Sequence, residues 1–250
     1  MPSGFRLRGP LQIRRLRRAQ AAAVVGDLEK ALRLARRAAA RHPDDPFAQL
    51  LYSRLLCARR RRADAGLAEL VPEIVDRVGK AVATSPSDAR ILTMAAYMTS
   101  LLVDGGVGDD ALYALARDYT ERASEAASRV NDFPYGTTVA RLKARFAEAE
   151  GHFDDAEHWY ARALTEQATA RKRRVNYKNT LVDSTSLFFL AETAPGVVID
   201  YARLLTKAGR HADALAVAQQ GVVDNPGDET LIALRERCEE ASSAESGHDS

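Results

Sequence analysis

The sequence is poor in the residues that interrupt helices and in those that favour strands. Its 250 residues include nine prolines, fifteen glycines and 6% aromatic residues, whereas alanine, leucine, arginine and glutamate are abundant. The alternation of β-branched or aromatic residues with polar ones that is typical of strands is almost absent. With 46% hydrophobic residues, the chain can still bury a large core. The composition therefore predicts an all-α protein.

Other absences disfavour whole classes of protein. No apolar run approaches the roughly 18 to 20 residues that cross a bilayer, and the basic N-terminus MPSGFRLRGPLQIRRLRRAQ lacks the apolar segment of a secretory signal. Cys57 and Cys238 lie far apart without a CxxC motif, so neither a disulfide framework nor a zinc site is expected. We expect a cytoplasmic protein with reduced thiols and no membrane span, with an organellar transit peptide as an alternative for the Arg-rich N-terminus. Thirty arginines against six lysines hint at a GC-rich bacterial genome.

Motifs for catalysis and for metal binding are also missing. The sequence contains no HExxH, no GxSxG and no phosphate-binding GxxxxGK[ST]. His152 and His158 are six residues apart, which places them on different faces of a helix, and DGGVGDD lacks the spacing of a calcium loop. Four acidic residues cluster around Gly151 and are interpreted as exposed turn charges: Glu148, Glu150, Asp154 and Asp155. We therefore expect no enzyme activity, no cofactor and no bound metal.

Three stretches share one spacing of small residues. They are GDLEKALRLARRAAARHP from Gly26, GHFDDAEHWYARAL from Gly151 and GRHADALAVAQQGVVDNP from Gly209. Five residues after each glycine stands an alanine, and seven residues further a second small residue: Ala31 and Ala38, Ala156 and Ala163, Ala214 and Gly221. A glycine can close a helix in the left-handed conformation, small residues let two helices cross closely, and a proline such as Pro43 or Pro226 ends the second helix. The spacing predicts hairpins of about 34 residues that stack on their neighbours, with first helices at 12–25, 137–150 and 195–208.

This pattern resembles the tetratricopeptide repeat (TPR) family in its glycines, its small-residue positions, its terminal prolines and aromatics such as Phe153 and Tyr160. The tryptophan and glycine of the family's first helix are missing. The resemblance implies a right-handed α-solenoid of five to six hairpins over residues 12–242, with GDETLIALRERCEEA as a C-terminal capping helix. A basic arm is expected at 1–11 and a disordered tail at 243–250.

Two regions of the array depart from the repeat. Residues 46–134 read as two degenerate hairpins, in which ADAGLAEL lengthens a second helix and the glycines at 104–108 form a turn. Residues 168–194 read as an irregular insert, comprising a helix end, a loop and a short extra helix in SLFFLAET. Phe188 and Phe189 in that helix are adjacent and point in different directions, so they are a candidate second contact surface.

The resemblance also implies a ligand-binding surface, because members of the family hold a peptide or a partner helix along the concave side formed by first helices. The matching positions are mostly cationic: Arg54, Arg90, Tyr97, Arg141, Arg145, Arg203 and Lys207. We therefore expect a non-catalytic adaptor or scaffold that binds an acidic peptide or partner helix. The alternative is that these arginines pair with acidic residues of neighbouring helices. The Lys and Asn with which some relatives clamp a terminal carboxylate are replaced by Leu16 and Gln20.

Charge is distributed unevenly along the chain. The overall net charge is +2, but residues 1–62 hold 16 Lys/Arg and 4 Asp/Glu, a net of +12, and the remainder carries −10. Clustered arginines neutralise phosphates, so a nucleic-acid-associated factor is the alternative function, with these candidate residues: Arg14, Arg15, Arg17, Arg18, Arg59, Arg60, Arg61 and Arg62. Solvated helix ends explain each run singly, as they do the run at 171–174, and no recognisable nucleic-acid motif accompanies the runs. A peptide-sensing regulatory subunit is a third possibility, suggested by the family resemblance alone.

Overall fold

The computed structural model describes residues 10–63, 66–107, 109–130, 135–176 and 184–246. Within these ranges, the side chains of 10–13, 24, 59–63, 170–176, 184–194 and 244–246 are not described. All secondary structure in the described residues is helical, as predicted, and amounts to eleven helices. None of these helices is both long and apolar enough to cross a membrane. The chain forms two compact units, Met1–Asn131 with Asp183–Thr185, and Asp132–Val182 with Ser186–Ser250.

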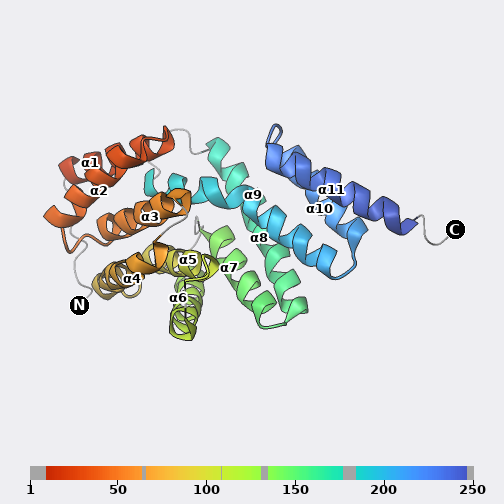
Figure 1. Ribbon diagram of the computed structural model, residues 1–250, viewed down its shortest axis with the longest axis horizontal. Helices are drawn as coiled ribbons and strands as arrows, with labels where there is room; N and C mark the ends of the chain where they lie inside the picture. Colours follow the sequence, from red (N-terminus) through yellow and green to blue (C-terminus); the bar gives the residue numbers. More distant parts are fainter. Residues whose placement is uncertain (1–9, 64–65, 108, 131–134, 177–183, 247–250) are drawn as a thin grey trace. The chain divides into compact units, whose positions relative to one another are not determined.

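The first unit contains three helix hairpins in chain order (Figure 1). Their helices are α1 (Pro10–Val24) with α2 (Leu28–Arg41), α3 (Pro46–Ala63) with α4 (Leu67–Thr84), and α5 (Ala89–Asp104) with α6 (Asp110–Ser128). Helix α2 also packs on α3, and α4 on α5. The degenerate repeats between 46 and 134 are thus hairpins as predicted, and α4 begins within ADAGLAEL at Leu67.

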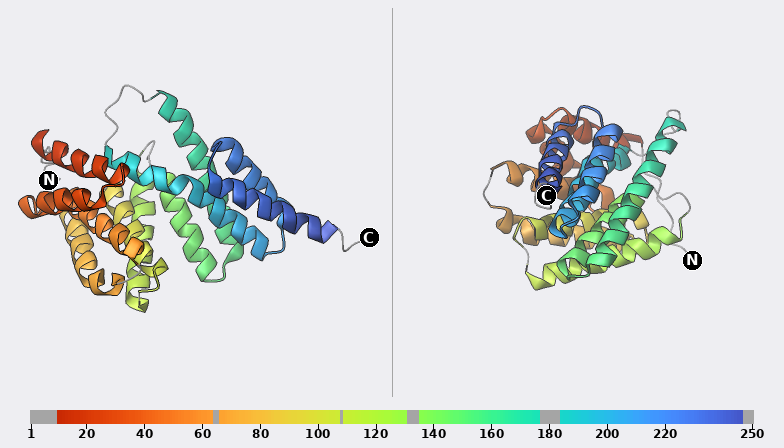
Figure 2. Two further views of the ribbon diagram at one scale, coloured as in Figure 1. Left: turned by 45° about the horizontal axis from the view of Figure 1, so that its top comes forward. Right: turned by 90° about the vertical axis from the view of Figure 1, so that its right-hand side faces the viewer.

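The second unit contains two hairpins and a final helix (Figures 1 and 2). The helices are α7 (Gly136–Ala149) with α8 (Phe153–Asn176), α9 (Ser184–Lys207) with α10 (His211–Asp224), and α11 (Glu229–Ser246), which packs on α10. In the described part of the chain, eleven helices therefore make five hairpins and a capping helix, as the repeat pattern predicts.

The glycine that opens each repeat closes a helix in the left-handed conformation. Gly26, Gly151 and Gly209 have φ angles of 84°, 79° and 73°. In each turn, the amide of the residue after the glycine donates to the carbonyl five residues earlier, at 2.8–2.9 Å. This arrangement satisfies carbonyls that the end of a helix would otherwise leave unpaired. The three turns therefore reverse the chain by the same local geometry.

The small residues of the repeat lie where two helices touch. Ala31, Ala156 and Ala214 are fully buried, Ala38 and Ala163 are at most 1% exposed, and Gly221 is also buried. A Cβ atom at Gly221 would lie 2.7 Å from Cγ1 of Val198, which is closer than real Cβ contacts come. The approach of α9 to α10 thus requires a residue without a side chain at position 221.

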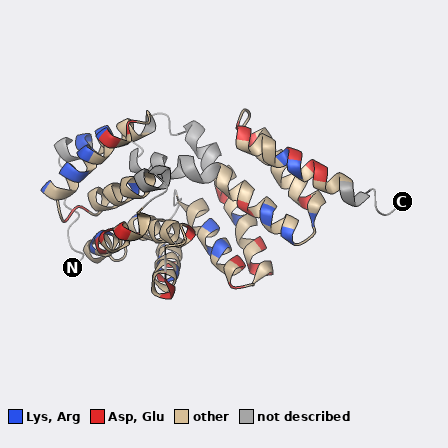
Figure 3. Ribbon diagram, viewed as in Figure 1, with Lys and Arg blue, Asp and Glu red and all other residues tan. Residues whose placement is uncertain are grey.

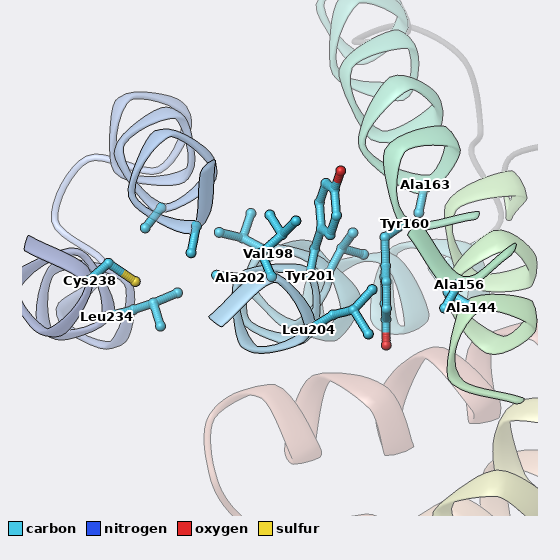
Figure 4. Close-up of a cluster of buried hydrophobic side chains, with 14 of the residues drawn as sticks. Ala144, Ala156, Tyr160, Ala163, Val198, Tyr201, Ala202, Leu204, Leu234 and Cys238 are labelled. Carbon is cyan, nitrogen blue, oxygen red and sulfur yellow. The ribbon is translucent and has the colours of Figure 1, made fainter. Parts of the chain in front are cut away.

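The core of the second unit joins all five of its helices. It combines alanines of α7 and α8 with Val198, Ala202 and Leu205 of α9, and it continues to Leu234 and Cys238 of α11. Figure 4 shows Tyr160 of α8 beside Tyr201 of α9 in this core. Their ring centroids are 5.7 Å apart at an interplanar angle of 18°, a stacked pair worth about 0.5–1.5 kcal/mol beyond its buried area.

The irregular insert and the tail differ from the predictions. The short extra helix expected in SLFFLAET is instead the first half of α9, which continues through Pro195. The proline was expected to begin a helix, but α9 runs through it and tolerates the loss of the hydrogen bond that proline removes. Helix α11 extends to Ser246, so only 247–250 of the expected tail lies outside the described residues, as do 1–9 of the expected arm.

Two glycines of the first unit give a matched test of the turn geometry. Gly26→Ala should lower the free energy of unfolding by about 1–2 kcal/mol, because position 26 has a positive φ that a Cβ disfavours. Gly79→Ala should raise it by about 0.4–1 kcal/mol, because Gly79 lies inside α4 and a Cβ there meets nothing within 4 Å. Urea unfolding of both variants measures the difference. Equal effects of the two changes would contradict the proposed role of Gly26.

Candidate functional site

Four of the seven predicted groove residues gather on α7 and α9 of the second unit. Arg141 and Arg145 are one helical turn apart on α7, and Arg203 and Lys207 are one turn apart on α9. Residues four apart lie on the same face of a helix, so each pair projects as one group. We call these four residues the α7–α9 cationic cluster. These four residues, which were selected by their positions in the repeat, are thus distant in sequence but close together in the structure.

Two carboxylates lie among these cations. Asp200 of α9 accepts a hydrogen bond of 2.8 Å from Nε of Arg141, and its Oδ2 lies 3.9 Å from Nε of Arg145. Glu148 of α7 accepts from Nζ of Lys207 at 2.8 Å and from Nη2 of Arg203 at 3.3 Å. The ion pairs therefore join α7 to α9 in both directions, as the alternative interpretation of these arginines predicted.

The two carboxylates are less exposed than the four cations. The side chains of Asp200 and Glu148 are 9% and 11% exposed, whereas those of Arg203 and Lys207 are 48% and 59% exposed. Four positive charges stand against two negative ones, which leaves a net charge of +2 in the cluster. The surface that meets solvent is therefore cationic even though its members are ion-paired.

Tyr160 forms the base of the cluster. Its ring is fully buried, as expected for an aromatic residue at a repeat position, and its hydroxyl donates to Oε2 of Glu148 at 3.2 Å. Burial, together with the negative charges of Asp200 and Glu148, raises the pKa of Tyr160 far above its ordinary value. The hydroxyl therefore stays protonated and serves as a fixed hydrogen-bond donor.

Opposing effects act on Glu148. Burial alone would raise the pKa of this carboxyl, but the hydrogen bond from Lys207 and the charges of Arg203 and Lys207 outweigh burial, and the pKa is lowered. Glu148 is therefore ionised at neutral pH. It was predicted to be an exposed turn charge, and this was wrong: it comes before the turn and faces α9, whereas Asp154 and Asp155 are exposed.

The predicted groove residues of the first unit have neighbours of their own. Arg54 is 3% exposed, and its guanidinium lies 5.8 Å from the ring centroid of Tyr97. Arg90 forms an ion pair of 2.9 Å with Asp88, the residue that caps α5. Burial would raise the pKa of Asp88, but hydrogen bonds from Arg90 and its charge lower it. Buried Arg54 and ion-paired Arg90 therefore contribute less charge to the surface than the α7–α9 cationic cluster.

The remaining candidates are placed as follows. Phe188 and Phe189 lie in α9 and Arg59–Arg62 in α3, but the side chains of these residues lie outside the described set, as do those of 171–174. On α1, Arg14, Arg17 and Arg18 are exposed and Arg15 is half-buried. Leu16 and Gln20, the positions that match the clamp of some relatives, are buried.

Trp159 is occupied by cations from two helices. Nζ of Lys143 on α7 lies 4.4 Å from its ring centroid, and the guanidinium of Arg162 lies 5.1 Å away. Such contacts contribute about 0.5–1 kcal/mol each at exposed sites. The contact between Lys143 and Trp159 therefore helps to hold α7 against α8.

Asp200 is the site residue that the sequence-based prediction missed. A single acid inside the apolar run PGVVIDYARLL was a usable signal, because a carboxylate so placed needs a cation. Among the described residues, no three His, Cys, Asp or Glu side chains are grouped so as to hold a metal ion. The chemistry that the α7–α9 cationic cluster offers is the binding of anions by charge and hydrogen bonding.

Replacing Glu148 tests its role in joining α7 to α9. Glu148→Gln should lower the free energy of unfolding at pH 7 by about 1–3 kcal/mol, because it removes two charged hydrogen bonds. Since the folded-state pKa is below the ordinary 4.5, this contribution is complete above pH 4.5 and disappears as the pH falls through the folded-state value. Urea unfolding near pH 7 and near pH 3 should show the variant and the wild type converging in acid. Glu240→Gln, at an exposed position of α11, is the control, and a pH-independent loss would contradict this account.

Comparison with known proteins identifies the fold. No protein-family model matches the chain, and no curated protein sequence does. The structure is similar to that of TTC0263, a thermophilic TPR protein of Thermus thermophilus, with a TM-score of 0.62 and 18% identity over 92% of this chain and 98% of that one. It is also similar to Acl4, an assembly chaperone of RpL4, with a TM-score of 0.55 and 11% identity over 95% of this chain and 85% of that one. The chain therefore has the fold of the tetratricopeptide repeat proteins.

Proposed function

We propose that the protein is a non-catalytic interaction adaptor that holds an acidic peptide or partner helix against the α7–α9 cationic cluster. The observation that carries this proposal is the arrangement of charge by depth, with carboxylates that are 9% and 11% exposed beneath cations that are up to 59% exposed. The TPR fold is generally a scaffold for protein interactions, which agrees with this role.

Burial of the carboxylates fixes the cations in place before a partner arrives. A long flexible side chain loses conformational freedom when it binds, and an existing ion pair has already imposed part of that loss. Asp200 and Glu148 also neutralise only half of the charge, so a partner's carboxylate meets a net attraction. The cluster is therefore suited to carboxylates on the partner's surface.

The test removes one cation from each of the two helices. In the variant Arg145→Gln/Arg203→Gln, half of the cations are removed, while Arg141 keeps its bond to Asp200 and Lys207 its bond to Glu148. Synthetic peptide arrays rich in Asp and Glu, each with an Asn and Gln counterpart, provide the probes. We expect acidic peptides to bind the wild type. We expect their affinity for the variant to be at least about tenfold lower, as the loss of close charge pairs across an interface implies.

A matched control comes from the same unit. Arg210→Gln/Arg237→Gln removes the same charge from the residue before α10 and from α11, and Arg210 pairs with Glu157 and Asp213. This control should bind acidic peptides like the wild type. Binding of the amide peptides as well as the acidic ones, or equal binding by both double variants, would contradict the proposal.

A further inference from the structure

The first hairpin carries more positive charge than its own carboxylates balance. Residues 14–44 contain nine Lys or Arg against three Asp or Glu, a net of +6. Eight of these cations are exposed, and we call them the α1–α2 basic face: Arg14, Arg17, Arg18, Lys30, Arg33, Arg36, Arg37 and Arg41. Among the residues that the structure describes, none of these eight side chains forms an ion pair or a side-chain hydrogen bond. Figure 3 shows basic positions along α2, where one acidic position interrupts them.

Elsewhere in the first unit, cationic side chains are paired with carboxylates. Arg77, Lys80, Arg90, Arg122 and Arg129 each form an ion pair with an Asp or Glu, mostly one helical turn away. On α2, Arg37 and Arg41 are instead one turn from Arg33 and Arg37, so like charges are neighbours. Such spacing costs stability in an isolated helix. The unpaired charge is thus a particular property of this hairpin and not of the unit's surface in general.

A need for a polar end to the array does not account for this face. The last helix, α11, is also an end, and its exposed side mixes signs, with an ion pair between Arg235 and Glu239 and with Glu236 and Arg237 beside them. Capping a stack of repeats requires only a polar outer surface. A surface on which one exposed carboxylate of α2, Glu29, stands among five exposed cations goes beyond that requirement and favours an anionic occupant.

The cations of α2 lie on one side of the helix, together with the exposed Glu29. At 100° per residue, Lys30, Arg33, Arg36, Arg37 and Arg41 fall within an arc of about 140°, and the buried Ala31, Leu32, Ala35, Ala38 and Ala39 occupy the opposite arc. From Lys30 to Arg41 this side is about 16 Å long. It can therefore meet several successive phosphates of an extended polyanion.

The α1–α2 basic face lacks aromatic residues, and this limits the kinds of ligand that it can bind. Residues 14–46 contain no Phe, Trp or Tyr, so the face has no ring on which a single-stranded base could stack. The exposed apolar positions between the cations are alanines such as Ala21 and Ala40 and a single larger residue, Val25 in the turn, and the apolar side of α2 is buried. Amphipathic membrane binders insert apolar residues, and protein interfaces bury an apolar or aromatic centre. Binding by charge alone is typical of contacts with the nucleic-acid backbone, where arginine is the favoured residue.

We propose that the α1–α2 basic face binds the phosphate backbone of duplex nucleic acid without reading its sequence. Guanidinium groups donate paired hydrogen bonds to phosphate oxygens and release the counterions that the duplex holds. Such contacts position a protein on a duplex but carry no base information. The site is separate in sequence and in chemistry from the α7–α9 cationic cluster, so either proposal can fail without the other.

The salt dependence of binding tests this proposal on the full chain. Fluorescence anisotropy would follow labelled DNA and RNA duplexes of about 20 base pairs between about 50 and 200 mM salt. For Arg33→Gln/Arg36→Gln/Arg37→Gln/Arg41→Gln, the slope of log affinity against log salt should become shallower by up to about 3.6, at about 0.9 for each phosphate that the variant no longer neutralises. Affinity at low salt should fall at least about tenfold. Glutamine retains helix propensity, and circular dichroism would confirm that α2 is intact.

The matched control removes four positive charges from three exposed sites and one half-buried site, Arg122, of the same unit, as Lys80→Gln/Arg117→Gln/Arg122→Gln/Arg129→Gln. Binding by this control with the wild-type slope supports the proposal, whichever duplex binds more tightly. Equal weakening by the two variants, or no duplex binding by the wild type at about 50 mM salt, would overturn it. Binding to phosphatidylserine vesicles or to polyglutamate in preference to duplexes would also overturn it, and would assign the face to a membrane or to an acidic protein.

Discussion

The structure depends on how closely two helices of a hairpin can approach. Fully buried alanines at positions 31, 156 and 214, and Gly221 against Val198, allow the backbones to come together, and a left-handed glycine before each second helix turns the chain back. Larger side chains at these positions would separate the helices and open the core. Contacts between neighbouring hairpins follow from this approach, because a hairpin presents a continuous apolar face only when its own two helices are in register.

The placement of carboxylates gives the two groups of arginines different properties. Asp200 and Glu148 lie beneath Arg141, Arg145, Arg203 and Lys207, and their charges hold α7 and α9 together while the cations remain accessible. On α2 no described carboxylate does the same for Arg33, Arg36, Arg37 or Arg41. A net count of charge would not separate these cases. The two groups of cations differ in whether an acidic residue lies beneath them.

The sequence predicted features that depend on neighbours in the chain, and it missed those that depend on distant ones. Glycine and alanine spacing located the hairpins at Gly26, Gly151 and Gly209, and repeat register identified the four cations that meet on α7 and α9. It could not show that Asp200, 59 residues from Arg141, is their partner, nor that Glu148 pairs with Arg203 and Lys207 of α9. The continuation of α9 through Pro195 was missed because local rules for proline favour a break, whereas the surrounding helix overrides them.

The unpaired arginines of the first hairpin also have a consequence for how the chain responds to its solvent. Repulsion among like charges along α2 is strongest when few ions are present, and added salt or a bound polyanion relieves it. The pairs between α7 and α9 respond in the opposite sense, since salt weakens attraction, although their burial limits the effect. Added salt therefore changes the electrostatic stability of these two regions in opposite directions, favouring the first hairpin and weakening the link between α7 and α9.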